Sequence, residues 1–305
     1  MSSLIEQAAK RLEQLKRAGA EIPSSAPKAQ PAPKQEVASQ TSAATTEHSP
    51  PQTTTSRSVE IDLDALAAAG IVSPNAPRSA IADQFRVVKR PLIANAIGKG
   101  ASVILNGNLI MVTSAMPGEG KSFTAINLAI SIATELDYTV MLVDADVARP
   151  SVLNRLGLPP SPGLLDLVVA DSCDLSSVLL KTNIDKLTIL PSGTPHPRAT
   201  ELLASDAMNR LVEDIGTRYA DRIIIFDSPP LLLTTESRVL ATHMGQVVIV
   251  VKAETTLQSD VRNAIATIEA CPVKLMLLNQ ATSSFKAGYG YGYGYGYGYG
   301  QEASK

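Results

Sequence analysis

The segment Ser114-Ala-Met-Pro-Gly-Glu-Gly-Lys-Ser122 constrains the fold of this chain more than any other part of it. The apolar run Leu109–Thr113 precedes it and predicts a strand, and Ser122–Glu135 follows it with the periodicity of a helix. A glycine-rich turn between a strand and a helix directs several backbone N–H groups at one point, which suits a bound phosphate. The segment therefore predicts a phosphate-binding loop, or P-loop, within an α/β domain.

Apolar strands alternate with amphipathic helices through the rest of this region. Further strands are predicted at Thr139–Val143, Leu187–Leu190, Arg222–Phe226, Gln246–Val251 and Val273–Leu278. Helices are predicted at Ile81–Arg90, where Pro91 ends the pattern, Thr200–Arg218 and Ser259–Ala270. Such alternation is typical of a mostly parallel central sheet covered by helices on both faces. We therefore expect a three-layer α/β P-loop NTPase domain over residues 79–283.

The sequence on either side of this domain differs in composition. Residues 1–22 have apolar side chains at helical spacing and predict an amphipathic helix. Residues 23–78 are rich in Pro, Ser and Thr and predict a disordered linker, with a docking segment at 59–71. Residues 284–305 predict a flexible tail, because glycine at every second position favours neither helix nor strand. The tail carries six tyrosines: Tyr289, Tyr291, Tyr293, Tyr295, Tyr297 and Tyr299.

Composition excludes several classes of protein. The chain has 305 residues, of which 45% are hydrophobic, and a formal net charge of −2, so bulk electrostatics give no reason to expect nucleic acid as a partner. Its two cysteines, Cys173 and Cys271, and its three scattered histidines fit neither a disulfide framework nor a zinc site. No apolar run approaches the ~20 residues of a membrane helix, and the N-terminus does not resemble a signal peptide. We therefore expect a soluble, cytoplasmic protein.

Aspartates follow two of the predicted strands. Asp144 and Asp146 end the strand that begins at Thr139, and Asp227 ends the strand that begins at Arg222. Because ligands of open α/β sheets bind at the carboxyl ends of strands, we expect these carboxylates to converge on the P-loop. Magnesium prefers such oxygen ligands. Lys121 would then reach the β- and γ-phosphates of ATP and Ser122 would bind Mg²⁺, while one aspartate holds the metal and another accepts a proton from an attacking hydroxyl.

These motifs resemble those of the bacterial tyrosine kinase family, the cytoplasmic autokinases of polysaccharide export systems. Residues 109–122 resemble its Walker A loop, Leu142–Asp146 its Walker A′ motif and Ile223–Pro230 its Walker B motif. The stretch 190–205 and the tyrosine tail are also similar to parts of that family, so the resemblance covers roughly residues 80–300. The N-terminal helix and linker look closest to the autokinases associated with exosortase (XrtA/PEP-CTERM) exopolysaccharide clusters.

The resemblance implies a non-specific protein-tyrosine kinase that transfers phosphate from ATP to the tyrosines of its own or a neighbouring tail and so regulates exopolysaccharide polymerisation and export. The catalytic residues implied are Lys121, Asp144, Asp146 and Asp227. The nucleotide-binding residues implied are Pro117, Gly118, Glu119, Gly120, Lys121, Ser122, Phe123 and Asn279. Magnesium would be held by Ser122, Asp146 and Asp227, and the phosphoacceptors would be the six tail tyrosines.

The resemblance also implies partners. A homo-oligomeric ring would form through Asp83-x-x-Arg86-x-x-Lys89, where the family has Glu-x-x-Arg-x-x-Arg. A membrane chain-length-determinant protein would activate the kinase and recruit it to the inner face of the membrane, and a tyrosine phosphatase would reset it. The chain departs from the family at Ala148, where an arginine is usual, and Ala115 replaces the first glycine of the P-loop.

A second interpretation is a spatial-organisation ATPase of the ParA/MinD group, which shares the fold and the acidic strand ends. Those proteins have a lysine at the position of Met116 and lack a tyrosine-rich tail, so both features favour the kinase. A third interpretation, motivated by Ala148, is a nucleotide-gated adaptor whose kinase activity is vestigial.

Overall fold

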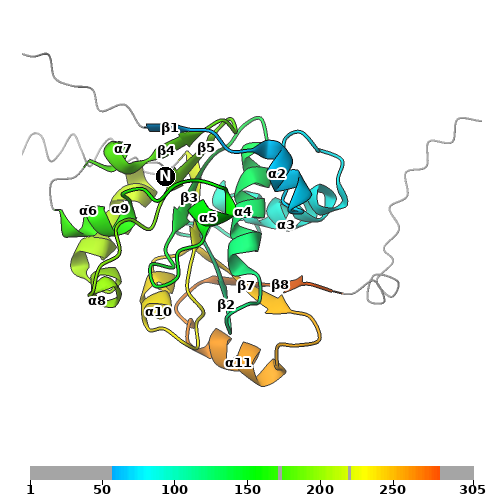
Figure 1. Ribbon diagram of the computed structural model, residues 1–305. Helices are drawn as coiled ribbons and strands as arrows, with labels where there is room; N and C mark the ends of the chain where they lie inside the picture. The colour runs from blue at the N-terminus through cyan, green and yellow to red at the C-terminus, as the bar shows by residue number, and fades with distance from the viewer. Residues whose placement is uncertain (1–56, 171–173, 219–220, 282–305) are drawn as a thin grey trace, which may run out of the picture. The chain divides into compact units, whose positions relative to one another are not determined.

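In the computed structural model, which describes residues 57–170, 174–218 and 221–281, one eight-stranded sheet has the strand order β1-β4-β5-β3-β6-β2-β7-β8 (Figure 1). The strands are β1 (Arg57–Val59), β2 (Leu109–Ser114), β3 (Thr139–Asp144), β4 (Leu180–Thr182), β5 (Leu187–Leu190), β6 (Arg222–Asp227), β7 (Gln246–Lys252) and β8 (Val273–Asn279). Neighbouring strands pair in parallel except β4 with β5, which are antiparallel. The predicted mostly parallel sheet is confirmed.

Helices cover both faces of this sheet. They are α2 (Leu63–Ala68), α3 (Ala80–Ala96), α4 (Lys121–Ala133), α5 (Val152–Arg155), α6 (Leu164–Val169), α7 (Leu175–Val178), α8 (Ala199–Leu203), α9 (Asp206–Arg218), α10 (Glu236–Ala241) and α11 (Gln258–Ala266). Because side chains alternate along a strand, each strand supplies two cores. In β2, Ile110 and Val112 pack in the core that contains α3 and α4, whereas Leu109 and Met111 pack in the core that contains α9.

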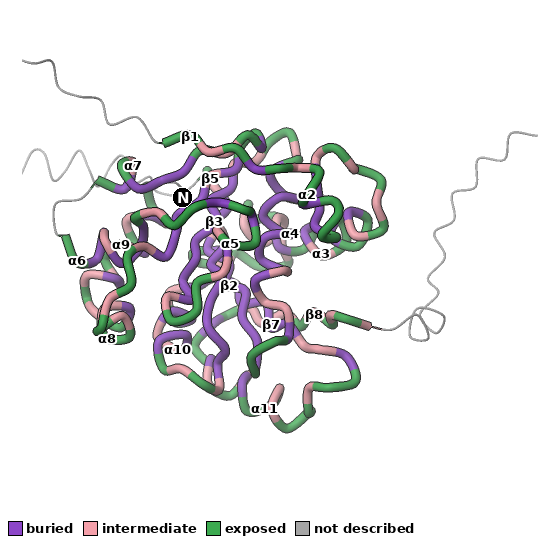
Figure 2. Tube along the Cα trace, in the orientation of Figure 1, coloured by how far each residue is buried: buried purple, intermediate pink, exposed green. Residues whose placement is uncertain are grey.

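The P-loop helix α4 lies in the middle of the first core. Eleven of its residues are buried, and Figure 2 shows it and the central strands as the buried part of the fold. A helix enclosed in this way is held by packing along most of its surface. Its first residue, Lys121, is therefore placed by the core as well as by the loop before it.

Helix α3 continues beyond the end predicted at Pro91. It runs from Ala80 to Ala96 with Pro91 inside it. Proline removes one backbone donor and strains the preceding turn. The following turn, however, places Leu92, which is 2% exposed, in the core. Burial of apolar surface in this turn offsets the lost hydrogen bond. The helix therefore continues past Pro91, although a proline usually ends a helix.

The single helix predicted over Thr200–Arg218 is two helices. Helix α8 ends at Leu203 and α9 begins at Asp206. Between them, the Ser205 hydroxyl accepts a hydrogen bond from the N–H of Met208 at 3.3 Å and donates one to the carbonyl of Leu202 at 2.7 Å. A serine that satisfies the free N–H groups of a first turn is a common helix start, and the sequence prediction did not use it.

Residues 57–78 pack on the domain, which differs from the linker predicted over 23–78. Strand β1 pairs with β4, and Ile61, Leu66, Ile71 and Val72 are buried in the first core. The N–H of Val72 donates to the side-chain oxygen of Asn127 on α4 at 2.7 Å. Four buried apolar side chains and this bond explain why the segment is ordered despite its neighbours' composition. The predicted docking segment 59–71 thus lies against its own domain.

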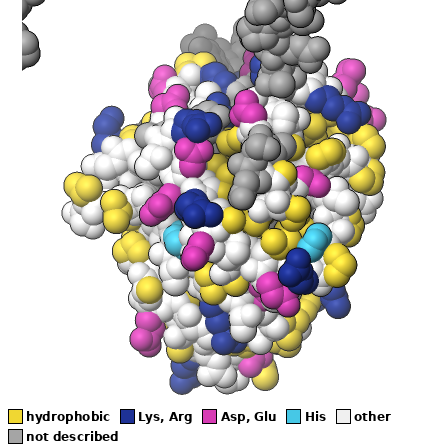
Figure 3. Space-filling view, turned by 90° about the vertical axis from the view of Figure 1, so that its left-hand side faces the viewer, with side chains coloured by type: hydrophobic (Ala, Val, Ile, Leu, Met, Phe, Trp, Pro, Cys, Tyr) yellow, Lys and Arg dark blue, Asp and Glu magenta, His cyan; other side chains and the backbone are white. Residues whose placement is uncertain are grey.

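Other predictions lie outside the described residues: the N-terminal helix (1–22), the linker up to residue 56 and the tyrosine tail (284–305). Within residues 57–170, 174–218 and 221–281, no helix combines the length and the apolar character of a membrane-spanning segment. On the face shown in Figure 3, basic and acidic side chains are interspersed with one another.

Candidate nucleotide and magnesium site

The P-loop lies between the end of β2 at Ser114 and the start of α4 at Lys121. Gly118 and Gly120 have φ values of 81° and 98°, in the left-handed region that disfavours other residues. Ala115, which replaces the first glycine of the family pattern, is fully buried and is not among the described residues with positive φ. The loop therefore needs glycine at 118 and 120 but accepts alanine at 115.

We expect Gly120→Ala to weaken ATP binding about tenfold more than Gly118→Ala. A Cβ atom on Gly120 would lie 2.1 Å from the side-chain nitrogen of Asn279, whereas one on Gly118 would meet nothing within 4 Å. Both variants share the backbone strain, but only Gly120→Ala also displaces Asn279 from the hydrogen bond described below, at a cost of about 1 kcal/mol or more. Titration of each variant with Mg·ATP measures the difference, and equal dissociation constants would contradict the argument.

Glu119 and Asn279 hold the shape of the loop. The buried Glu119 carboxylate accepts the N–H of Met116 at 2.9 Å and a hydrogen bond from the Thr256 hydroxyl. The Asn279 side chain donates to the carbonyl of Glu119 at 2.9 Å. The side chains of these two predicted nucleotide-binding residues therefore brace the P-loop. Thr256, after β7, completes the brace, and no sequence signal points to it.

Asp144 and Asp227 lie side by side at the ends of β3 and β6. They are directly opposite in the parallel register of these strands. Leu142 and Ile225, two residues earlier, both pack in the core that contains α4. Since side chains repeat every second residue along a strand, both carboxylates project to the side of the sheet where α4 begins. The structure thus brings these two predicted site residues together next to the P-loop.

Asp146 and Lys121 form an ion pair, with 2.7 Å between Lys121 Nζ and Asp146 Oδ2. The second oxygen, Asp146 Oδ1, accepts the N–H of Arg149 at 3.2 Å. Both side chains are largely buried, so the pair is poorly screened by solvent. The Lys121 ammonium is therefore held by a carboxylate of its own chain.

The two strand-end carboxyls have raised pKa values. Burial raises the pKa of Asp227 to about 7, although the positive charge of Lys121 acts in the opposite direction. Burial also raises the pKa of Asp144 to about 6, against hydrogen bonds from the N–H groups of Val152 and Ser151. A nearby cation would favour the charged form of both groups.

The residues present fit a divalent cation. Both carboxylate oxygens of Asp227 and the Oδ1 atom of Asp144 are buried without a hydrogen-bond partner in the described structure. Unpaired buried carboxylates are costly unless a positive charge compensates them. The described residues contain no ready-made cluster of three or more His, Cys, Asp or Glu side chains for a metal. Two unpaired carboxylates beside a phosphate-binding loop suit Mg²⁺, which keeps several waters and takes one or two protein carboxylates together with phosphate oxygens.

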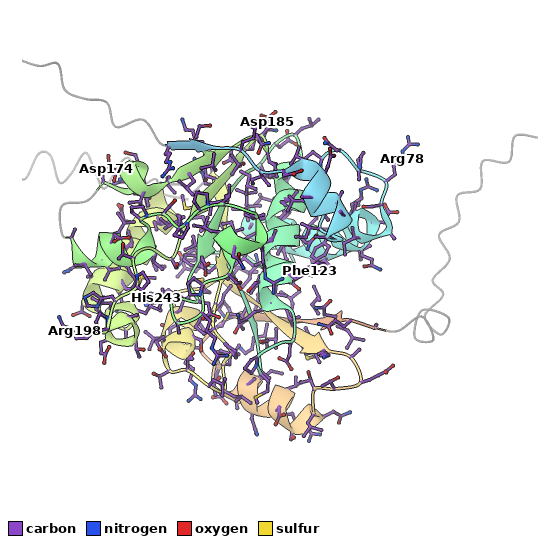
Figure 4. All side chains as sticks on the ribbon, viewed as in Figure 1. Arg78, Phe123, Asp174, Asp185, Arg198 and His243 are labelled. Carbon is purple, nitrogen blue, oxygen red and sulfur yellow. The ribbon has the colours of Figure 1, made fainter. Side chains whose placement is uncertain are left out.

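A cavity of about 700 Å³ adjoins the P-loop on the side of β8. Phe123, labelled in Figure 4, lines it from α4, between α3 and the end of β8. The other residues around it are Ile81, Gln84, Phe85, Val88, Gly118, Gly120, Arg155, Leu277, Leu278, Asn279, Gln280 and Ala281. Apolar and aromatic walls with a few polar groups are typical of a pocket for a flat organic ring.

Comparisons with known proteins match the part of the chain that contains this site. The profile of a protein family described as an AAA domain matches residues 107–279. The tyrosine-protein kinase YwqD of Bacillus subtilis is 30% identical over 206 residues, which cover 68% of this chain and 83% of that protein. The chain belongs to the bacterial tyrosine kinase family.

Two further comparisons support the membership in this bacterial tyrosine kinase family. The tyrosine-protein kinase CpsD of Streptococcus agalactiae is 32% identical over 178 residues, 58% of this chain and 76% of that protein. The crystal structure of the chimerical protein CapA2B2 has a TM-score of 0.57 and 27% identity, and the match covers 73% of this chain and 93% of that one. The predicted family and fold class are confirmed.

In this bacterial tyrosine kinase, the two basic residues of the predicted ring motif have partners within their own chain. Arg86 forms an ion pair with Asp83 on the same helix. Lys89 is only 5% exposed, donates to the carbonyl of Ser131 at 2.5 Å and lies 2.6 Å from Glu135 Oε1. The prediction that Lys89 contacts a neighbouring subunit is therefore corrected, because this lysine joins α3 to the carboxyl end of α4.

Proposed function

We propose that this chain is an ATP-dependent protein-tyrosine autokinase. The observation that carries the proposal is the set of Lys121, Asp144, Asp146 and Asp227 beside the P-loop, in a chain of the bacterial tyrosine kinase family. The P-loop N–H groups would bind the phosphates of ATP, as the start of a helix favours. Lys121 would leave Asp146 and neutralise the β- and γ-phosphates.

Asp144 is the best placed general base. One of its oxygens, Oδ2, accepts hydrogen bonds from the N–H groups of Ser151 and Val152 at 3.1 and 3.0 Å, which leaves Oδ1 without a partner. A pKa of about 6 leaves this carboxylate mostly ionised at pH 7.5 and makes it a better proton acceptor than an ordinary aspartate. Asp144 would take the phenolic proton as the tyrosine oxygen bonds to the γ-phosphorus and the bond to ADP breaks.

Ser122 and Asp227 would hold Mg²⁺ in this site, with Asp146 as the third ligand proposed. Bound magnesium supplies positive charge that stabilises the phosphoryl group in transfer. The Ser122 side chain is near enough to Asp227 to act against the larger effect of burial on the pKa of that carboxyl. The adenine ring would enter the cavity lined by Phe123 and Asn279.

The acceptors that we propose are the six tyrosines between Tyr289 and Tyr299, which lie outside the described residues. Many equivalent phenols on one chain raise the local substrate concentration, so that no single tyrosine needs tight recognition. Each added phosphate brings about −1.5 to −2 charges. Repulsion from the acidic site would then release a modified tail.

We expect the full chain incubated with Mg·ATP to gain mass in whole phosphate steps, and a chain cut after Gly288 to gain none. The cut removes all six proposed acceptors and leaves every described residue in place. Intact-mass spectrometry measures the result, and a chain with the six tyrosines changed to phenylalanine is the matched control for length. Release of ADP without any mass gain would instead favour an organiser ATPase or a nucleotide-gated adaptor.

The wider setting is also part of this proposal. The kinase would regulate the polymerisation and export of an exopolysaccharide whose synthesis is encoded by an exosortase-type gene cluster. It would act at the cytoplasmic face of the membrane. A membrane chain-length-determinant protein would activate it, and a tyrosine phosphatase would remove the phosphates. Self-association through α3 would depend on Asp83 and Arg86, since both are exposed and Lys89 is not.

A further inference from the structure

We propose that Arg155 binds the nucleotide and that Asp144 positions it. Arg155 ends the short helix α5, which follows β3 and the two aspartates Asp144 and Asp146. Its position was not among the nucleotide-binding residues predicted from the sequence. The inference rests on the proposed ATP site, but it concerns affinity for ATP and not phosphate transfer.

The cavity beside the P-loop has one charged side chain in its wall. Among its described lining residues, Arg155 is the only ionisable one, and the others are apolar, aromatic, glycine or amide residues. Arg155 is exposed and has no ion-pair or hydrogen-bond partner for its guanidinium among the described residues. Gly118 and Gly120 of the P-loop line the same cavity. A cation in the same cavity as these glycines is suited to a nucleotide whose phosphates lie at the P-loop and whose ring occupies the apolar part.

Asp144 determines where α5 begins. Its Oδ2 atom accepts the N–H groups of Ser151 and Val152, at 3.1 and 3.0 Å, directly before and at the first residue of α5. Val152 is fully buried in the same core as α4, which fixes the inner side of this turn. With its start tied to a strand end and its inner side packed, α5 directs Arg155 at the cavity. One carboxylate thus serves two purposes: Oδ2 holds the start of the helix that carries the arginine, and Oδ1, which has no partner in the described structure, is left for the proton transfer proposed above.

Titration with Mg·ATP, and with an analogue that has a methylene group between the β- and γ-phosphates, tests the role of Arg155 without requiring turnover. We expect Arg155→Ala to weaken binding about tenfold or more, as for the loss of a charge-assisted hydrogen bond. The affinity of Arg155→Lys should lie between those of the unaltered chain and Arg155→Ala, because lysine keeps the charge but lacks the planar guanidinium group. Arg78→Ala is the control, since Arg78 is exposed, does not line the cavity and lies away from Phe123 in Figure 4. Binding by Arg155→Ala within twofold of the unaltered chain would overturn the proposal.

Two substitutions of Asp144 separate its charge from its hydrogen bonds to α5. Asparagine keeps an oxygen that accepts the N–H groups of Ser151 and Val152, whereas alanine does not. Removal of a negative charge near the triphosphate should by itself tighten ATP binding. We therefore expect Asp144→Asn to bind ATP at least as tightly as the unaltered chain, and Asp144→Ala to bind it more weakly.

The double variant Asp144→Ala/Arg155→Ala should bind ATP no more weakly than Arg155→Ala alone, because the two changes act through one contact. Tighter binding by Asp144→Ala, equal to that of Asp144→Asn, would show that Asp144 does not position Arg155. If ATP binding depends on Arg155 but the tail gains no phosphate, the proposed kinase function fails and this inference stands. If the tail is phosphorylated but Arg155→Ala binds ATP normally, the inference fails alone.

Discussion

A chain with Lys121→Met is expected to transfer phosphate to its tail at least about 10³-fold more slowly than the unaltered chain, because a cation that stabilises the charge of a transferring phosphoryl group contributes on this scale. Methionine has a similar length but no charge. In the structure Lys121 is the only described cation paired with a strand-end aspartate of the site. The rate is measured by quenched intact-mass spectrometry at saturating Mg·ATP.

The same substitution leaves Asp146 buried without its partner, so loss of activity must be separated from loss of fold. Asp146 still accepts the N–H of Arg149, which limits the damage. Lys121→Arg is the matched control, because it keeps the ion pair with Asp146 but changes the shape of the cation. We expect Lys121→Arg to retain the thermal midpoint and to lose most of the activity. Transfer by a folded Lys121→Met chain within tenfold of normal would rule out the role proposed for Lys121.

The second large effect is expected from Asp227→Asn, which should raise the thermal midpoint of the ligand-free protein at pH 8 and abolish its stabilisation by Mg·ADP. Asp227 is fully buried, its oxygens have no hydrogen-bond partner in the described structure, and its pKa is raised from 3.8 to about 7. At pH 8 the folded protein must therefore hold a charge that the unfolded chain would carry in water at lower cost. Each kcal/mol regained corresponds to about 2–4 °C for a domain of this size.

The stability of the protein should fall with rising pH because of Asp227. Because the folded pKa of Asp227 lies above the unfolded value, the folded state binds the proton more tightly. The stability from this group is complete below about pH 4 and is lost as pH rises through about 7. Melting curves between pH 5 and 8 should fall more steeply for the unaltered chain than for Asp227→Asn. Asp144, whose pKa is raised to about 6, still titrates in the variant, so part of the slope remains there. Parallel curves would contradict the assignment.

Much of the fold and the site was predictable because it follows from local rules. The strand Leu187–Leu190 has the predicted bounds, since a short, mostly apolar run between Lys186 and Pro191 has few alternatives. Asp144 and Asp227 were expected at one edge of the sheet because strands of a parallel sheet end together. The P-loop itself follows from glycines at positions that need a positive φ.

The remaining features depend on contacts between distant segments, which a local pattern does not contain. Pro91 predicts a helix end, but the burial of Leu92 against the core outweighs that rule. Lys89 resembles an exposed charge, yet Ser131 and Glu135, more than forty residues later, provide it with partners inside the fold. The hydrogen bonds from Ser151 and Val152 to Asp144 depend on the path of a loop, and for that reason Arg155 was missed.

The hydrogen bond between Asn279 and the carbonyl of Glu119 has a geometric consequence for the tyrosines. This bond fixes the start of the segment that leads to the tyrosines at the same loop that would hold the phosphate donor. Tyr289 follows Ala281 by eight residues and Tyr299 by eighteen, so their farthest reach is about 29 Å and about 65 Å for a fully extended chain. The number of residues between Ala281 and each tyrosine thus sets how distant an active site that tyrosine can reach. A deletion within 282–288 would shorten the reach of all six tyrosines together and would leave the residues of the site unchanged.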